Sequence, residues 1–558
     1  MAELKKDLQY FLRQKIYILA LALTAVCSYG YSIVQPSIGI DDTAVSLYLE
    51  DGLEVVMGRW TIFWLNRFFH VSDFAPFMTE LVGVLFLMLA ATLFNVLFRR
   101  LVGERAGLLA STVFACAFVS NPIISEVFVY YWHDGAGLGY VLTALALLSF
   151  HSGLEAQGKA RLGAFAGSLL SVWAAVGCYE SFLILYILGI LTVLFLWGMA
   201  DAKRLKLSSV SLWLCVGAAL TVGCVLLRSV MIALTTELFH LGGVLEQVKQ
   251  NERGFSEMLA LFGPDGWDNL VMLLKRFWVV YHLNAVVYLP VTVYELAVFI
   301  FGAAAVILAV KKRNLWFPVL YLGMLVTPFL LTLAEMRLSY YRSCQYLPFF
   351  AAAGVWLLCV GLMGVERIQT SRRFRKALQT CLVLGAAILV WNQAEFMNRS
   401  FYTDYRKYET TRELLCEIAW EIERDYGNET PVVFTGHYST PHELAKDYYV
   451  SYGSKQYQYI AAITDKVDPH LKEKYFSVWG YSFVGEANFP MIQWAFDAFD
   501  GTNREMINFL KMHGHPFRTV TDPEVLAQAR ELGDEMPGYP AEGSVTKQDG
   551  YILVHIMD

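Results

Sequence analysis

The stretch IYILALALTAVCSYGYSIV, residues 16–34, decides what kind of fold this chain can adopt. It contains no charged residue, and as an α-helix it is long enough to cross the roughly 30 Å hydrocarbon core of a bilayer. The residues around Cys27 offer neither a small-residue cleavage site nor a good lipobox, so a removed signal peptide is not indicated. We therefore expect a retained transmembrane helix near the N-terminus.

The composition extends this expectation to most of the chain. Of the 558 residues, 56% are hydrophobic, 15% aromatic and only 17% charged, whereas soluble proteins carry about 25% charged residues. The charges cluster between apolar runs of spanning length. These runs predict a mainly α-helical, polytopic membrane protein with about eleven transmembrane helices, at 16–34, 76–98, 106–122, 136–152, 162–178, 181–199, 208–228, 287–310, 315–333, 345–364 and 377–396.

The basic residues of the connections predict how the chain is oriented. If the N-terminus lies in the cytoplasm, every strong basic cluster among the connections falls on the cytoplasmic side, as the positive-inside rule requires. The C-terminus then lies outside, and so do the polar loops that contain the candidate functional residues. The clusters are Arg99/Arg100/Arg105, Lys159/Arg161, Lys203/Arg204/Lys206, Lys311/Lys312/Arg313 and Arg367/Arg372/Arg373/Arg375/Lys376.

Residues 397–558 differ from the rest of the chain in being more charged and lacking any run of spanning length. PVVFTGH (431–437) predicts a buried strand with a glycine turn, KQDGYILVHIMD (547–558) a turn and a final strand, and TTRELLCEIAWEIERDYG (410–427) an amphipathic helix. We therefore expect a transmembrane domain, 1–396, and an extracytoplasmic α/β domain, 397–558. The second domain has no glycine-rich phosphate loop, so no cofactor is assigned to it.

The first outer loop begins with PSIGIDDTAVSLYLEDG, residues 36–52, where Asp41 and Asp42 closely follow an apolar run. Asp42 can cap a short helix over TAVSLYLE. A carboxylate beside the apolar boundary is costly without a partner or a function, and a base that deprotonates an acceptor hydroxyl would fit there. After Gly52, residues 53–69 predict a second, strongly aromatic helix that lies in the membrane interface.

Arginines on the outer side are the next candidates. Arg337 and Arg342 flank LSYY between two predicted spans, and Arg59 lies in the predicted interfacial helix. A lone interfacial arginine commonly extends toward lipid headgroups, but the planar guanidinium also matches the oxygens of a phosphate. We interpret these three residues as candidate phosphate ligands.

Two further outer connections place polar groups among apolar residues. YYWHDG supplies His133 and Asp134, and CYESF supplies Tyr179 and Glu180. A metal site at His133 and Asp134 would lack further ligands at regular spacing, so we predict none. Aromatic rings beside carboxyl groups suit sugar rings, although aromatic belts occupy the same depth in any membrane protein.

Read in order, the motifs GIDD, GRWTIFWLNRFF, CYESF, RLSYYR and YTDYRKYE resemble those of the Gtr-type bacterial glucosyltransferases, which decorate O-antigen and other surface polysaccharides. The resemblance covers roughly residues 16–410. It implies a membrane glycosyltransferase of the GT-C architecture in the bacterial inner membrane. Such an enzyme takes a sugar from a polyprenyl-phosphate carrier on the outer face, and an acidic residue of the first outer loop is commonly its catalytic group.

Carried over by motif, the resemblance nominates Asp41 and Asp42 as catalytic, and it leaves open which of the two is the base. It nominates Arg337 and Arg342 for the carrier phosphate. Direct displacement would invert the anomeric configuration, and a phosphate leaving group needs no metal or other cofactor. The residues expected to line the pocket are Tyr341 of RLSYYR together with His133, Asp134, Tyr179 and Glu180.

Two other function classes stay open at this point. A transporter or flippase of lipid-linked sugars would favour charges within the spans, paired broken helices and internal repeats. A non-catalytic scaffold for polysaccharide assembly would tolerate loss of both aspartates. Within the transferase class, the residues do not identify the sugar, and the acceptor can be a surface glycan or a lipid-linked molecule.

Overall fold

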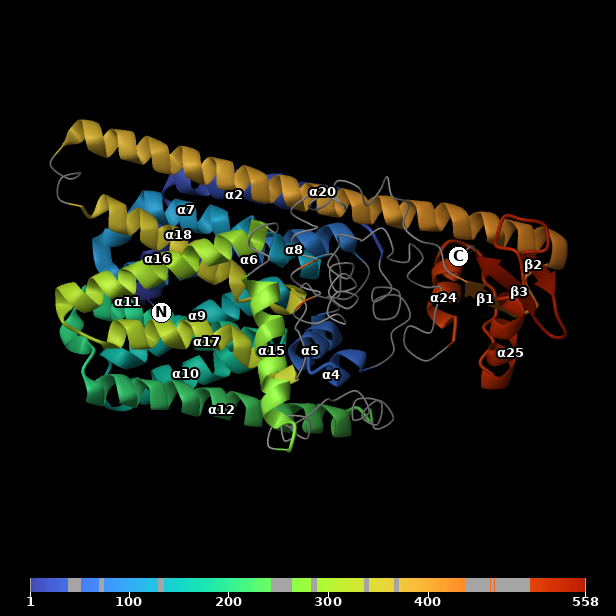
Figure 1. The fold of residues 1–558 in the computed structure, drawn as a ribbon, viewed down its shortest axis with the longest axis horizontal. Helices are drawn as coiled ribbons and strands as arrows, with labels where there is room; N and C mark the ends of the chain where they lie inside the picture. The colour runs from blue at the N-terminus through green and yellow to red at the C-terminus, as the bar shows by residue number, and fades with distance from the viewer. Residues whose placement is uncertain are drawn as a thin grey trace.

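In the computed structural model, the described residues are mostly helical, and they include one small sheet near the C-terminus (Figure 1). It describes residues 2–38, 52–69, 75–128, 135–241, 263–282, 289–335, 341–365, 371–436 and 502–556, together with residues 462 and 466. The helical part contains α1 (Ala2–Leu12), α2 (Lys15–Val34), α4 (Leu53–Val56), α5 (Trp60–Phe69), α6 (Pro76–Val102), η2 (Gly103–Ala106), α7 (Leu108–Val119), α8 (Pro122–Phe128), α9 (Gly135–Glu155), α10 (Gly158–Val176), α11 (Phe182–Ala200), η4 (Ala202–Arg204), α12 (Leu207–Leu238), α15 (Gly266–Tyr281), α16 (Leu289–Lys312), α17 (Trp316–Glu335), η7 (Tyr341–Ser343), α18 (Leu347–Met363) and α20 (Arg372–Tyr426). The C-terminal part contains β1 (Val432–Gly436), α24 (Arg504–Met512), α25 (Pro523–Gly533), β2 (Val545–Lys547) and β3 (Ile552–Ile556).

The long helices form one bundle of roughly parallel and antiparallel rods (Figure 1). Among the described residues, eight helices are long and apolar enough to cross a membrane, and counting α7 and α8 together gives a ninth span. The other two predicted spans correspond to α10 and to the shorter apolar helix α18. The protein is therefore a polytopic membrane protein, while eleven spans stay a prediction.

The surface of the bundle is apolar, as contact with lipid requires. Large hydrophobic side chains are exposed along α12, α16 and α20, whereas aromatic and aliphatic side chains fill a continuous core between the helices. In a bilayer the exposed set would face acyl chains rather than water. Examples are Leu226, Val230 and Leu234 on α12, Val306 and Val310 on α16, and Leu384, Ile388 and Trp391 on α20.

The predicted span 106–122 is not one straight helix. α7 ends at Val119 and α8 begins at Pro122, with a bend of 43° between them. Pro122 has no backbone N–H to continue the preceding helix, and its fixed φ suits the first turn of a new one. The bend thereby turns the short, fully buried helix α8 into the interior of the bundle.

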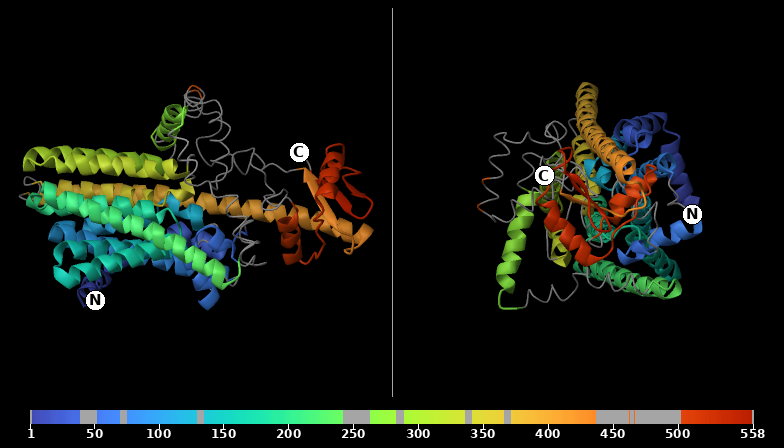
Figure 2. Two further views of the ribbon diagram at one scale, coloured as in Figure 1. Left: turned by 90° about the horizontal axis from the view of Figure 1, so that it is seen from below. Right: turned by 90° about the vertical axis from the view of Figure 1, so that its right-hand side faces the viewer.

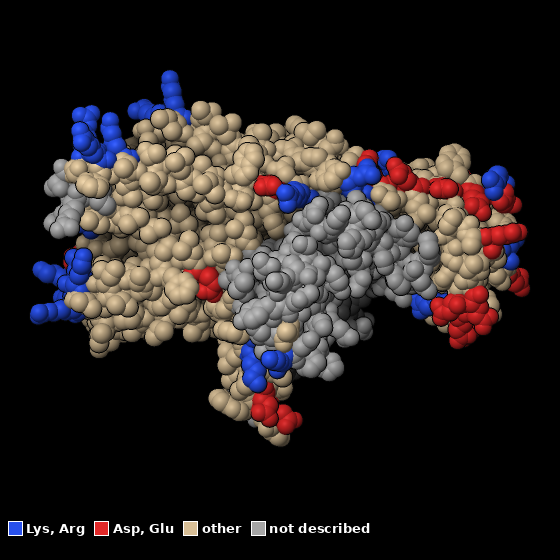
Figure 3. All heavy atoms as spheres, turned by 45° about the horizontal axis from the view of Figure 1, so that its top comes forward, with Lys and Arg blue, Asp and Glu red and all other residues tan. Residues whose placement is uncertain are grey.

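The connections divide between two ends of the bundle. At the basic end, the side chain of Asn314 donates to the backbone oxygens of Ala202 and Leu205, while Arg204 pairs with Glu155 at 3.2 Å. The opposite end, which we call the candidate-site end, contains α4, α5, the turn at residues 177–181 and η7. Figure 3 shows Lys and Arg side chains gathered at one end of the bundle. This division follows the predicted alternation of the connections.

Helix α20 is the longest element and links the bundle to the C-terminal part (Figures 1 and 2). It runs without a break from Arg372 to Tyr426, so the amphipathic helix expected at 410–427 is the last part of a longer helix. The expected domain boundary at 396/397 falls inside it. Gly427, at φ +74°, ends the helix because this backbone conformation is unfavourable for residues with a Cβ.

The sheet has the strand order β1-β3-β2, with β1 parallel and β2 antiparallel to β3. Alternate residues face opposite sides, as the two-residue period of a strand requires. Phe434 and Val554 pack with α24 and with Ile418 of α20, whereas Val433 and Leu553 pack with α25. Both faces of the sheet are thus covered by helices, and β1 and β3 correspond to the two strands predicted from the sequence.

Candidate functional site

A glycine elbow sets the position of Arg59. The single helix expected over 53–69 is divided into α4 and α5, and Gly58 between them has φ +77°. A Cβ placed on Gly58 would lie only 2.1 Å from Nη2 of Arg228 on α12. The backbone conformation therefore favours glycine here, and any Cβ at this position would displace the end of the Arg228 side chain.

Helix α5 is attached to the turn between α10 and α11. The backbone N–H of Thr61 donates to the oxygen of Gly177 at 3.0 Å, and its hydroxyl donates to the oxygen of Ala174 at 2.9 Å. The indole rings of Trp60 and Trp173 pack with their centroids 4.3 Å apart. These contacts bring the motif GRWTIFW against CYES, although more than a hundred residues separate the two.

Arg59 and Tyr179 form the centre of this contact. The guanidinium carbon of Arg59 lies 4.8 Å from the centroid of the Tyr179 ring, a cation–π arrangement. The Tyr179 hydroxyl shares a hydrogen bond of 3.3 Å with Ser343 in η7. Burial raises the pKa of Tyr179, and the positive charges of Arg59 and Arg342 oppose that rise. Arg59 therefore lies on the Tyr179 ring, and the same side chain is hydrogen-bonded to the segment that carries Arg342.

Gln345 fixes the segment that carries Arg342. This fully buried side chain donates to the backbone oxygens of Arg342, at 2.7 Å, and Ile123, at 3.2 Å. The hydroxyl of Tyr140 on α9 donates to its side-chain oxygen at 2.7 Å. Because these groups bind α8, α9 and η7 together, the backbone of Arg342 has a defined place at the candidate-site end.

Tyr341, expected to line the pocket, is almost fully buried, at 2% exposure. Its ring packs against Tyr281 of α15, whose hydroxyl lies 2.8 Å from the sulfur of Cys344. Helix α15 runs across the direction of the long bundle helices (Figure 1). In the structure Tyr341 thus connects α15 to η7.

Arg228 is a functional candidate that the sequence analysis missed. Its Nη2 lies 3.3 Å from Oε2 of Glu180, a residue predicted for the pocket wall. Its Nε is buried and has no hydrogen-bond partner among the described residues. The signal in the sequence was an arginine at the end of the apolar run 208–228, which is also a common place for an arginine that extends toward headgroups.

A second group of residues joins the exit of α2 to α20. Ser37 donates a hydrogen bond to the carboxylate of Asp404, and the ring of Tyr31 lies 6.0 Å from that of Tyr402. One turn after Asp404, Lys407 is only 5% exposed, and burial lowers its pKa to about 8. Asp404 and Lys407 belong to the motif YTDYRKYE, but no feature of the sequence indicated that Lys407 would be buried.

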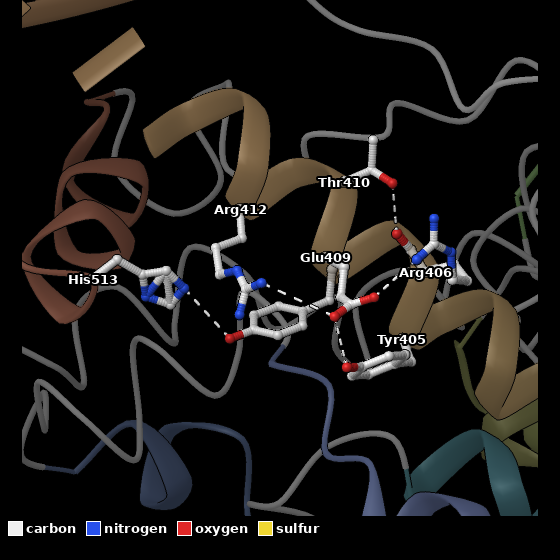
Figure 4. A network of polar contacts seen from close by, with 7 residues as sticks. Tyr405, Arg406, Glu409, Thr410, Arg412 and His513 are labelled. Carbon is white, nitrogen blue, oxygen red and sulfur yellow. Dashed lines mark hydrogen bonds and ion pairs between the residues drawn. The ribbon is translucent and has the colours of Figure 1, made fainter. Parts of the chain in front are cut away.

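Further along α20, charged and aromatic groups form a polar network (Figure 4). Glu409 accepts hydrogen bonds from the Tyr405 hydroxyl at 2.7 Å and from Arg406 at 2.9 Å, and Arg412 lies 4.0 Å from it. Tyr408 reaches His513 of the C-terminal part at 3.4 Å. The network fixes the side chains of α20 where the helix leaves the bundle.

Two buried carboxylates also lie toward the candidate-site end. Glu80 in the second turn of α6 and Glu126 in α8 are 1% and 4% exposed. Phe128, two residues after Glu126 in α8, packs against Tyr29 with the ring centroids 5.1 Å apart, and Gly83 of α6, three residues after Glu80, lies against the same Phe128 ring. Carboxylates inside apolar helices are a functional signal, and single glutamates in apolar surroundings were visible in the sequence.

The other predicted site residues lie outside the residues that the structure describes. These are Asp41, Asp42, His133, Asp134 and Arg337. Within the described part of the chain, no group of three or more His, Cys, Asp or Glu side chains could hold a metal ion. The site that can be described therefore consists of arginine, tyrosine and glutamate side chains.

A cavity of about 290 Å³ lies at the basic end, away from this site. It is bounded by the end of α1, by η2 and by the start of α7. Its lining includes Tyr10, Phe11, Arg99, Glu104 and Ser111.

Comparison with known families supports the assignment that these motifs suggested. The family model described as glucosyl transferase GtrII matches residues 30–390, which include Arg59, Tyr179, Arg228 and Arg342. No curated protein and no solved structure matches the chain significantly. The chain belongs to the glucosyl transferase GtrII family and is a glycosyltransferase of the membrane.

Proposed function

We propose that this enzyme transfers a glucosyl group from a polyprenyl-phosphate carrier to a surface glycan or a lipid-linked acceptor on the extracytoplasmic side of the bacterial inner membrane. The observation that carries the proposal is the contact of Arg59 with Tyr179, whose hydroxyl is hydrogen-bonded to Ser343, the residue next to Arg342, at the end of the bundle opposite the basic connections. Guanidinium groups at this depth match the oxygens of a lipid-linked phosphate.

The proposed chemistry is a single displacement. The acceptor hydroxyl attacks the anomeric carbon, the bond from that carbon to the phosphate oxygen breaks, and the polyprenyl phosphate leaves with the electron pair. Asp41 or Asp42 takes the hydroxyl proton as general base. The leaving phosphate gains one negative charge during this step. Arginine side chains already positioned around it stabilise that charge, and each such donor is worth about 2.7–4 kcal/mol in comparable roles.

The same proposal includes the arrangement of the chain. Eleven spans, with the N-terminus inside and the C-terminus outside, place the candidate-site end at the outer leaflet. The transmembrane domain, 1–396, holds the donor, and the α/β domain, 397–558, lies on the acceptor side. The chemistry requires no metal or other cofactor, because the leaving group is a single phosphate held by arginines.

The test uses purified protein in nanodiscs with polyprenyl-phosphate-[¹⁴C]glucose and cell-envelope glycan. We expect wild type to transfer label, and either Asp41→Asn or Asp42→Asn to abolish transfer while donor binding persists. If neither substitution lowers transfer, the proposed base is wrong. If wild type binds the donor and moves it across a vesicle bilayer without forming a glycoside, the transporter alternative replaces the proposal.

A further inference from the structure

Arg228 and Glu180 extend the candidate site beyond the residues that the motifs nominate. Gly58 and Arg59 lie side by side in the elbow before α5, and Tyr179 and Glu180 are neighbours in the turn before α11. Arg59 lies over Tyr179, while Arg228 lies against Gly58 and pairs with Glu180. Arg228 of α12 therefore contacts the residues next to Arg59 and Tyr179 in the two segments, namely Gly58 and Glu180.

The Arg228 side chain does not extend outward into the lipid or water as a lone interfacial arginine would. Its helix exposes large apolar side chains at Val225, Leu226 and Val230, yet the Arg228 side chain is only 24% exposed. It turns toward Glu180, whose own side chain is 55% exposed. The direction of the side chain thus favours a role in the site over headgroup contact.

The hydrogen bonding of Arg228 is incomplete. One contact to Glu180, at 3.3 Å, is long for a charge-assisted hydrogen bond. The buried Nε has no partner among the described residues. A guanidinium has five N–H donors, so Arg228 keeps donors for a further anion while Nη2 contacts Glu180.

We propose that Arg228 is a third arginine of the donor site, which Glu180 holds in the resting enzyme and which turns to the leaving phosphate during transfer. The inference rests on the proposed function, since it concerns the same phosphate. The donor is a phosphodiester with one negative charge, and the released polyprenyl phosphate can carry two. Arg228 thus responds to the charge that appears, while Glu180 competes with the phosphate for the guanidinium.

This arrangement predicts a difference between donor and product. An arginine that engages only the growing charge stabilises the transition state more than the bound donor, so its loss lowers kcat more than it raises KM. We expect Arg228→Gln to lower kcat about 100-fold and to weaken inhibition by polyprenyl phosphate more than it raises the donor KM. Arg228→Lys should retain only part of the wild-type kcat, because the ammonium group lacks the planar pair of N–H donors of a guanidinium.

Glu180→Gln should change the inhibition by polyprenyl phosphate in the opposite direction. Removing the competing carboxylate should strengthen inhibition by polyprenyl phosphate several-fold while the protein remains folded. A purely structural ion pair would instead make both single variants lose stability together and leave the ratio of product inhibition to donor KM unchanged. That ratio is the measurement that separates the two roles. Arg67→Gln, an exposed arginine on α5, is the matched control and should behave as wild type.

Phosphate at this depth can also come from membrane lipid, so the assays are run in two kinds of nanodisc. In phosphatidylcholine alone and with added phosphatidylglycerol, the Arg228→Gln defect should be equal. A defect seen only with the anionic lipid would assign Arg228 to a lipid headgroup and overturn the inference. If Asp41→Asn and Asp42→Asn abolish transfer but Arg228→Gln leaves kcat unchanged, the inference fails while the proposed function stands. If neither Asp variant nor Arg228→Gln affects transfer, both fail.

Discussion

The hydroxyl of Ser37 donates a hydrogen bond to the carboxylate of Asp404, although 367 positions separate the two residues along the chain. Further contacts lie along the same pair of helices, since the side chain of Asn398 donates to the backbone oxygen of Cys27 and Tyr31 packs near Tyr405 at 6.2 Å. The exit of α2 is thereby attached to α20 at a fixed position. In the sequence, this exit leads directly to Asp41.

Ser37→Ala should destabilise the protein. The substitution removes a hydrogen bond to a charged, partly buried group, which costs about 1.5–3 kcal/mol. Ser400→Ala on α20 is the control, because among the described residues that hydroxyl bonds to the backbone oxygen of Phe396 in its own helix, and its loss should cost less. Thermal unfolding in nanodiscs measures both, and an equal or smaller loss for Ser37→Ala would show that the contact to Asp404 contributes nothing.

Arg59→Gln and Arg342→Gln should each lower the transfer rate by about 100-fold to 1,000-fold, since each would remove a charged donor of the proposed phosphate site. The side chains occupy the same site, so the double variant should lose less than the product of the two effects. Steady-state transfer of radiolabelled glucose measures this. Arg67→Gln serves as control, and rates near wild type for both single variants would remove the phosphate role.

Tyr179→Phe and Tyr179→Leu separate the two contacts of this side chain. Phenylalanine keeps the ring under Arg59 and removes the hydroxyl that bonds to Ser343, a hydrogen bond worth about 1 kcal/mol. Leucine also removes the aromatic face. We expect a small change in donor KM for Tyr179→Phe and a larger increase for Tyr179→Leu, measured by titrating the donor. Equal KM values would mean that the ring does not position Arg59.

Gly58→Ala should be inactivating because it combines a positive φ with a clash against Arg228. The conformation alone costs about 1–2 kcal/mol for a residue with a Cβ. Gly103→Ala is the matched control, because Gly103 has φ +67° but a Cβ there would meet nothing within 4 Å. Both variants should therefore lose a similar amount of conformational stability, and only Gly58→Ala should also lose transferase activity. If Gly103→Ala loses as much activity, displacement of Arg228 is not the cause.

Lys407 should make stability depend on pH in the alkaline range. Burial lowers its pKa to about 8 in the folded protein, against about 10.4 for an exposed lysine. Between these values the unfolded chain binds more protons than the folded one, so stability rises with pH. We expect the unfolding temperature to increase between about pH 8 and pH 10, and Lys407→Met to remove this contribution. An unchanged slope in the variant would contradict the assignment to Lys407.

The sequence by itself determined the membrane character of the protein and the approximate positions of its helices. Both depend on local properties, namely the length of an apolar run and the charges at its ends, which do not need a partner elsewhere in the chain. Strands β1 and β3 were predictable for the same reason, since each is a short apolar run bounded by turn residues. The motifs also indicated the family, because their residues and order are properties of the sequence alone.

Tertiary structure decided which of these residues meet. Arg59 reaches Tyr179, Arg228 reaches Glu180, and Ser37 reaches Asp404 only because distant helices lie side by side. No local pattern distinguishes Arg228 from an arginine that extends toward lipid, or Lys407 from an exposed lysine of an amphipathic helix. Burial and the direction of a side chain depend on what packs against it, and that is a property of the assembled bundle rather than of any one segment.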